Sequence, residues 1–232
     1  MIAREGLLFI FIGLIVTVLS ILAASRWNSS WMFGLSVLFG VLTLFVTFFF
    51  RDPQRDFTAG PGLLVSPADG KVIKIEQLPS HPFVGGPTTK VSIFLSVFDV
   101  HINRVPGSGV IDYVKYNPGT FHAAWADKAS ELNEQTDIGM TTESGQKIAF
   151  KQIAGLIARR IVCKLNERDI VKAGDRFGLI RFGPRTELFV PSATSVLVKV
   201  GDKVYGGQTP IAQLLVSPHV KQAAQGVGQH DN

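Results

Sequence analysis

The chain has 232 residues, a hydrophobic fraction of 46% and a formal net charge of +5. It has a single cysteine, which excludes an internal disulfide, and its cysteine and histidine spacing does not suggest a zinc or other metal site. Its basic residues form no run interleaved with aromatic residues, which argues against nucleic acid as a partner.

Two uncharged apolar runs occupy the N-terminus, 18 residues over 7–24 and 20 residues over 31–50. Because a helix rises about 1.5 Å per residue, each run can cross a hydrocarbon core of about 30 Å. A cleaved signal peptide is the alternative for the first run, but the run is long and a second follows after six residues. The pattern predicts a two-helix transmembrane hairpin over residues 1–50.

Charges around the hairpin predict its orientation. Arg4 flanks one end, Arg51 and Arg55 flank the other, and the polar link between the runs contains only Arg26. By the positive-inside rule, this distribution favours both ends and the C-terminal part on the cytoplasmic side of the cell membrane.

The rest of the chain predicts a linker over 51–62 and one mainly β (α+β) domain over 63–220, long enough for a core of its own. Short β-branched runs alternate there with Gly, Pro and Asp turns. The expected strands cover residues 62–65, 71–76, 89–94, 109–116, 147–152, 159–163, 188–190 and 195–198. Residues 121–134, richer in Ala, Lys, Glu and Leu, predict a short helix, and residues 221–232 predict a disordered tail.

Residues 200–212 resemble the turn pattern of lipoyl and biotinyl carrier domains, which indicates a barrel-sandwich-like β architecture. A membrane-anchored carrier domain would need a modifiable lysine in a hairpin turn. Lys128 lies in a tripeptide that agrees with the lipoyl motif, but this tripeptide lacks the flanking pattern and is far from 200–212. Carrier function is therefore disfavoured.

Several strings, in order, carry a second resemblance. They are SPADGKV (66–72), FDVHINRVPGSG (98–109), YNPG (116–119) with DKAS (127–130) and NE (133–134), QIAGLIARRI (152–161) and FGLIRFGPRTELFVP (177–191). These strings resemble those of the phosphatidylserine decarboxylases and cover most of residues 51–216. The short form with an N-terminal hairpin resembles the bacterial and archaeal branch of that family.

The resemblance implies conversion of phosphatidylserine to phosphatidylethanolamine through a self-generated pyruvoyl group. In the family, a serine hydroxyl attacks the carbonyl of the preceding glycine, the chain breaks, and the serine becomes the pyruvoyl electron sink. Here Gly183 stands before the cleavage point and Pro184 stands at the serine position. Because proline has no hydroxyl, we expect this chain to stay uncleaved and inactive, without a pyruvoyl group.

Gly178 and Gly183 predict a tight, exposed turn whose backbone carbonyl is open to attack. Pro184 suits such a turn through its preset φ, but it removes both the hydroxyl and a backbone N–H. The hydroxyl residues at 186, 192 and 195 do not follow a glycine, so none of them is a substitute nucleophile.

Four side chains are candidate site residues, the first three through the resemblance. Asp69 matches the catalytic aspartate, which would orient or deprotonate a histidine or accept the serine proton; alternatively it caps an Asp-Gly turn. His101 matches a family histidine that would act as base in cleavage or acid after decarboxylation; alternatively it is a hydrogen-bonded strand histidine. Arg104 stands where some members have a second histidine and would meet the substrate phosphate. His122 would border the pocket or lie on the surface.

Two interpretations of function stay open. The first is a phosphatidylserine decarboxylase-type enzyme, or a close lipid-headgroup decarboxylase, in which Pro184 blocks cleavage. The alternative is a natural non-catalytic relative that binds aminophospholipid at the membrane. The expected partners are a phospholipid membrane, whose anionic headgroups suit a basic domain, and an aminophospholipid, and the chain is compatible with a homo-oligomer.

Overall fold

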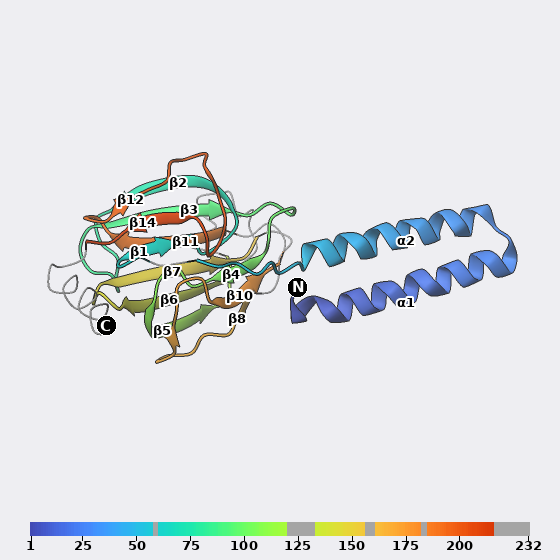
Figure 1. Cartoon of the computed structure of the whole chain (residues 1–232), viewed down its shortest axis with the longest axis horizontal. Coiled ribbons are helices and arrows are strands. Elements are labelled where there is room, and N and C mark those ends of the chain that lie inside the picture. Colours follow the sequence, from blue (N-terminus) through green and yellow to red (C-terminus); the bar gives the residue numbers. More distant parts are fainter. Residues whose placement is uncertain (58–59, 120–132, 156–160, 182–184, 216–232) are drawn as a thin grey trace, which may run out of the picture. The chain divides into compact units, whose positions relative to one another are not determined.

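The computed structural model describes residues 1–57, 60–119, 133–155, 161–181 and 185–215. The chain divides into two compact units, Met1–Gln54 and Arg55–Asn232. The first unit is helical and the second consists of β-strands, as the ribbon shows (Figure 1).

Two apolar helices, α1 (Arg4–Trp27) and α2 (Ser30–Phe49), form the first unit. Their most apolar stretches have mean hydropathies of 2.9 and 2.3, so both are long and apolar enough to cross a membrane. Asn28 ends α1 in the left-handed conformation, with φ of 44°, and donates its backbone N–H to the carbonyl of Ala24. Asparagine tolerates this conformation, so the chain can reverse within two residues.

Small and hydroxyl-bearing side chains bring the two helices together. The hydroxyls of Thr17 and Thr43 lie 3.3 Å apart, and each also donates to a carbonyl within its own helix. Gly13 makes room for Thr43, whose Oγ1 is only 2.6 Å from the position that a Cβ on Gly13 would take. Close backbone approach at small residues is the usual way in which apolar helices associate.

The second unit contains fourteen strands in its described part. They are β1 (Leu63–Val65), β2 (Gly70–Leu78), β3 (Thr88–Phe94), β4 (Ile102–Arg104), β5 (Gly109–Asn117), β6 (Gln135–Thr142), β7 (Lys147–Ile153), β8 (Ile161–Cys163), β9 (Ile170–Val171), β10 (Arg176–Ile180), β11 (Arg185–Pro191), β12 (Ser195–Val196), β13 (Lys203–Val204) and β14 (Pro210–Gln213).

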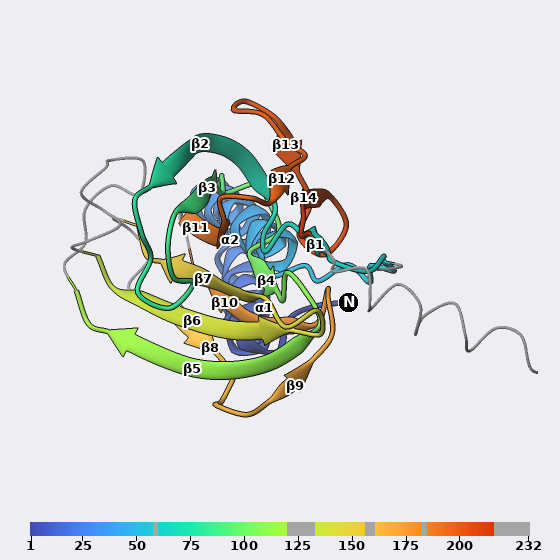
Figure 2. The ribbon, with the colours of Figure 1, turned by 90° about the vertical axis from the view of Figure 1, so that its left-hand side faces the viewer.

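These strands form three antiparallel sheets. The largest has the order β13-β2-β3-β11-β7-β6-β5-β9 and curls into a half-barrel, which Figure 2 shows from β2 round to β5. Two smaller sheets have the orders β1-β14-β12 and β4-β10-β8. Since β10 and β11 belong to different sheets, the chain between them passes from one sheet to another.

A row of apolar side chains in register forms the centre of the core. Leu188 on β11 lies opposite Val91 on one side and Phe150 on the other, and Phe150 lies opposite Ile138. All four are at most 1% exposed. The intervening residues on these strands, such as Lys151 and Asp137, face the other side of the sheet, as strand alternation requires.

The predicted fold class is confirmed: a mainly β domain follows a helical hairpin, and its main sheet is a curled, antiparallel half-barrel. Each of the eight expected strands overlaps an observed one. The sequence interpretation missed β4, β6, β9, β10, β13 and β14. The expected helix over 121–134 lies almost entirely outside the described residues, and the expected tail lies entirely outside them.

The prediction that Gly178 belongs to an exposed turn is wrong. Gly178 is a buried residue of β10, paired with Asn103 on β4 and Cys163 on β8. A Cβ there would come within 2.2 Å of the Val162 carbonyl oxygen. The glycine is therefore needed because two strands approach each other closely here. A glycine of this kind cannot be told from a turn glycine by sequence alone.

Candidate active site

Asp69 lies in the turn that joins β1 to β2 and is 4% exposed. Ser66 shapes this turn by donating its hydroxyl to the Ala68 carbonyl at 2.7 Å. Gly70 follows with φ of 151°, and a Cβ there would lie 2.2 Å from the Phe94 carbonyl oxygen. Only glycine fits this position, so the Asp-Gly pair is a requirement of the turn as well as a feature of the site.

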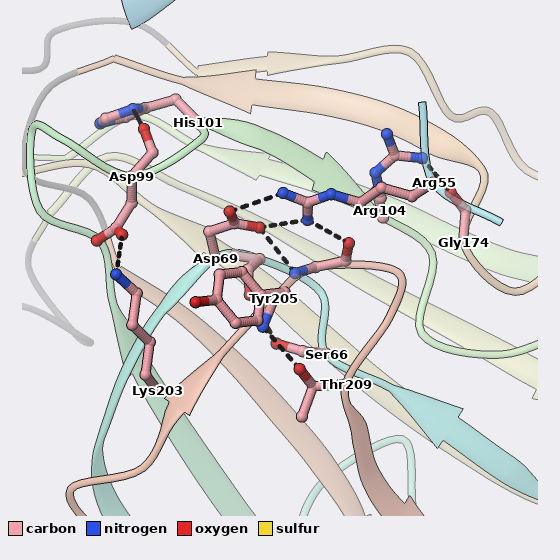
Figure 3. A network of polar contacts seen from close by, with 12 residues as sticks. Arg55, Ser66, Asp69, Asp99, His101, Arg104, Gly174, Lys203, Tyr205 and Thr209 are labelled. Atoms are coloured by element: carbon pink, nitrogen blue, oxygen red, sulfur yellow. Dashed lines mark hydrogen bonds and ion pairs between the residues drawn. The ribbon is translucent and has the colours of Figure 1, made fainter. Parts of the chain in front are cut away.

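The carboxylate of Asp69 binds an arginine and a backbone amide. Both of its oxygens accept hydrogen bonds from the Arg55 guanidinium, with Arg55 Nη2 at 2.8 Å from Oδ2, and Gly206 N–H donates to Oδ1 at 2.8 Å (Figure 3). Arg55 also donates to the Gly206 carbonyl. Among the described residues, Asp69 is therefore held by Arg55 and Gly206, not by a histidine.

His101 is fully buried in the segment between β3 and β4. Its Nδ1 lies 2.9 Å from the Asp99 carbonyl oxygen, which can only accept, so Nδ1 carries the proton of this hydrogen bond. In the neutral ring Nε2 then holds the lone pair. The carbonyl of His101 accepts the N–H of Ile180, three residues before Gly183, so the histidine is anchored to the strand that leads to the expected cleavage point.

Arg104 is on β4 and is 4% exposed. Its Nη1 donates to the Gly174 carbonyl at 2.9 Å (Figure 3). Its backbone N–H donates to the Pro67 carbonyl. A Cβ on Gly207 would lie 2.5 Å from its Cδ. Arg55, Asp69 and Arg104 come from different segments, and all three contact the turn that contains Gly206 and Gly207.

The remaining predicted site residues, His122, Gly183 and Pro184, lie outside the described residues. Both flanks of the last two are described. β10 ends at Ile180, and β11 begins at Arg185 in the middle of the main sheet, paired with β3 and β7. Cys163 on β8 pairs with Gly178 on β10, and burial raises the pKa of its thiol above the usual value.

A buried polar group that the sequence analysis missed lies beside these flanks. Gln152 on β7 donates through Nε2 to Asn103 Oδ1 at 2.9 Å and to the Val162 carbonyl at 3.3 Å, and it lies opposite Thr186 on β11. Gln152, Asn103 and Thr186 are at most 1% exposed. The signal in the sequence was a polar residue at a core-facing position of an apolar strand.

Arg55 and Gly206 were missed as well. Arg55 was counted among the charges that flank the apolar runs, and Gly206 was assigned to a carrier-like turn. Neither has a local pattern that points to Asp69, because the three residues are far apart in the chain.

Comparison with known proteins identifies the family of the chain. The phosphatidylserine decarboxylase family model matches residues 42–212. A phosphatidylserine decarboxylase proenzyme from Syntrophus aciditrophicus is 49% identical over 210 residues, 90% of this chain and 96% of the relative. Proenzymes of the same name from Desulfotalea psychrophila and Symbiobacterium thermophilum are 46% and 47% identical over 92% of the chain, and 97% and 95% of those proteins are covered. The chain belongs to the phosphatidylserine decarboxylase family.

Proposed function

We propose that the fold of this chain serves the decarboxylation of phosphatidylserine to phosphatidylethanolamine at a membrane, and that the chain with Pro184 stays uncleaved and inactive. The relatives are named phosphatidylserine decarboxylase proenzymes, and this chain has Asp69 and His101, both buried. The observation that carries the second half of the proposal is Pro184 itself, at the position where the family has its reactive serine.

The residues present do not fit the formation of a pyruvoyl group. That group derives from a side-chain hydroxyl that follows a glycine, and Pro184 has neither a hydroxyl nor a backbone N–H. The nearest hydroxyl along the chain belongs to Thr186, which follows Arg185 and is 1% exposed within β11. Its place between β3 and β7 leaves it no freedom to replace the missing serine.

In this proposal the buried side chains have distinct roles. His101 acts through Nε2 as proton acceptor or donor, because its Nδ1–H is directed to the Asp99 carbonyl. Asp69 is a fixed negative charge that holds Arg55 and the Gly206 turn in place. Arg104, and His122 outside the described residues, are assigned to binding of the substrate headgroup.

We further propose that the helical hairpin of residues 1–50 crosses the cell membrane, that 51–62 is the linker, and that the β domain of 63–220 is cytoplasmic. Support comes from the length and hydropathy of α1 and α2 and from the arginines at both ends of the hairpin. Protease treatment of inverted vesicles tests the orientation. Digestion of the β domain in inverted but not in right-side-out vesicles is expected, and the reverse would contradict it.

The alternative function is a natural relative that lost catalysis and binds aminophospholipid. Pro184 favours this alternative as much as it favours a blocked enzyme. The blocked enzyme and the binding protein differ in what happens when the hydroxyl is restored. A site preserved for chemistry then regains self-cleavage, whereas a binding protein does not.

The experiment compares the full chain with the variants Pro184→Ser and Pro184→Ala on a denaturing gel and by intact mass. We expect one band for the unaltered chain and for Pro184→Ala, which regains the N–H without the hydroxyl. Cleavage of Pro184→Ser between residues 183 and 184, with a pyruvoyl group on the small fragment, supports the enzyme. An uncut Pro184→Ser favours the binding protein, and cleavage of the unaltered chain contradicts the proposal.

A further inference from the structure

Four exposed side chains lie on the segments around the site, and we call them the rim: Lys71, Phe98, Lys203 and Tyr205. Phe98 is 66% exposed and Tyr205 is 45% exposed. The Lys203 side chain is 63% exposed, and Lys71 is also an exposed residue. The rim therefore combines two aromatic side chains in solvent with two ammonium groups.

Contacts within the second unit hold three members of the rim together. Lys71 on β2 is the direct register partner of Lys203 on β13, so both side chains leave the same face of the sheet. The ammonium of Lys203 lies 5.8 Å from the centre of the Tyr205 ring. It also lies 3.7 Å from Asp99 Oδ1, and Asp99 is the next residue after Phe98 (Figure 3).

The rim shares its backbone with the buried site. Lys71 comes two residues after Asp69, and Tyr205 directly precedes Gly206, whose N–H binds Asp69. Phe98 comes three residues before His101, whose Nδ1 is bonded to the Asp99 carbonyl. The same turns thus position the site on the inside and the rim on the outside.

The charges of the rim call for an anionic partner. Two like charges opposite each other on neighbouring strands are unfavourable without a counter-charge. Asp99 offsets at most one of the two charges: its Oδ1 forms an ion pair with Lys203 at 3.7 Å, and its Oδ2 accepts two hydrogen bonds from Ser96. The next loop residues, Lys199 and Asp202, carry opposite charges and leave the sign of the rim positive.

We propose that the rim docks onto an anionic phospholipid surface, with Phe98 and Tyr205 at the level of the headgroups and Lys71 and Lys203 on the lipid phosphates and carboxylates. Aromatic rings and long basic side chains are the residue types that settle at such interfaces. The inference rests on the membrane anchoring proposed above and does not require catalysis.

The chain itself favours lipid over a protein partner. Arg55, which binds Asp69, follows the last residue of α2 by six positions, and six extended residues span at most about 20 Å. With α2 in a bilayer, the covalent link would keep the site and its rim within reach of the headgroups. A second copy of the chain would present the same positive charges and would be repelled.

A fluorescence test in proteoliposomes examines this surface directly. In a Cys163→Ser background, an environment-sensitive dye is attached to the full-length variants Phe98→Cys, Tyr205→Cys and, as control, Ile170→Cys. Ile170 is 86% exposed on β9, at the other end of the main strand order from β13 (Figure 2). Vesicles contain phosphatidylserine or only phosphatidylcholine, with a quencher on the upper acyl chain.

In phosphatidylserine vesicles we expect quenching and a blue shift at 98 and 205 but not at 170, and loss of both signals in phosphatidylcholine. Each neutralised rim lysine is expected to weaken docking roughly five-fold. Lys71→Gln/Lys203→Gln should therefore lose the signal, whereas Lys115→Gln/Lys147→Gln should keep it. Equal signals at 98 and 170 would overturn the proposal. So would a signal at 98 that depends on the number of protein molecules per vesicle instead of on the charge of the lipid.

Discussion

Arg55 binds both carboxylate oxygens of Asp69, although the two residues are fourteen positions apart in the chain, and their side chains are only 6% and 5% exposed. The same guanidinium reaches the Gly206 carbonyl, and Gly206 N–H returns to Asp69. A residue of the segment that leaves the helical unit is thus part of the buried site, so the folding of this segment and the geometry of Asp69 depend on each other.

The first prediction concerns this ion pair. Arg55→Met leaves the Asp69 carboxylate buried with one amide donor, and breaking a buried pair costs about 3 to 5 kcal/mol of stability. Arg55→Met/Asp69→Asn should recover a large part of this loss, since no unpaired charge remains. Thermal unfolding followed by intrinsic fluorescence measures both variants.

Arg51→Met is the matched control, because the Arg51 guanidinium lies 3.9 Å from the centre of the Phe48 ring and donates to the Phe48 carbonyl within the helical unit. Its unfolding temperature should change little. If Arg55→Met and the double variant were equally destabilised, the ion pair would not be what holds Arg55 in place.

The second prediction separates two properties of Gly70. A Cβ on Gly70 meets both an unfavourable φ of 151° and the Phe94 carbonyl oxygen at 2.2 Å, whereas Gly85, with φ of 78°, has nothing within 4 Å. Gly85→Ala should cost about 1 kcal/mol for the left-handed backbone alone. Gly70→Ala should cost about 2 to 4 kcal/mol, because the strand must also move. Chemical denaturation measures the free energy of unfolding of both variants. Equal losses would mean that the contact with the Phe94 carbonyl contributes nothing to the cost of Gly70→Ala.

Much of the fold was predictable from local pattern. The helices follow from two uncharged apolar runs, and β3, β5 and β7 follow from β-branched runs between turn residues. The missed strands lack such a local pattern. β13 and β14 are short, and β6 contains an Asp and a Gly, residues that are rare in strands. Their pairing with distant partners, not their own composition, makes them strands.

The candidate site, too, has residues that the sequence indicates and residues that it does not. Asp69 and His101 could be proposed as site residues because they stand in strings that resemble a family. Arg55 joins Asp69 through a contact across the fold, and Gly178 is required by Val162 on a neighbouring strand. Such contacts depend on strand order and register, which no local sequence pattern states.

The third prediction is a pH dependence of stability that comes from His81. Its pKa is lowered mainly by burial, against a smaller opposing effect of Asp137, and its Nδ1 accepts the backbone N–H groups of Phe83 and Val84. The folded state therefore prefers the neutral ring. Stability should be constant above the ordinary pKa of about 6.5 and fall as the pH drops from there toward the lower folded value.

His81→Asn keeps a side-chain acceptor for the two N–H groups and removes the titration, so it should flatten the unfolding temperature between pH 7 and 5. An unchanged slope in this variant would assign the pH dependence to another group.

The fourth prediction tests the role of His101 once the hydroxyl is restored. Pro184→Ser/His101→Asn keeps a side-chain N–H that can reach the Asp99 carbonyl, but it lacks the Nε2 atom. If Nε2 accepts the serine proton, this variant should fold and remain uncut, with a loss of about 10²-fold or more in cleavage rate relative to Pro184→Ser. Intact mass against time measures the rate, and unfolding temperature verifies the fold. Cleavage at the Pro184→Ser rate would show that another group takes the proton. Rapid cleavage together with loss after Asp69→Asn would move that role to the carboxylate.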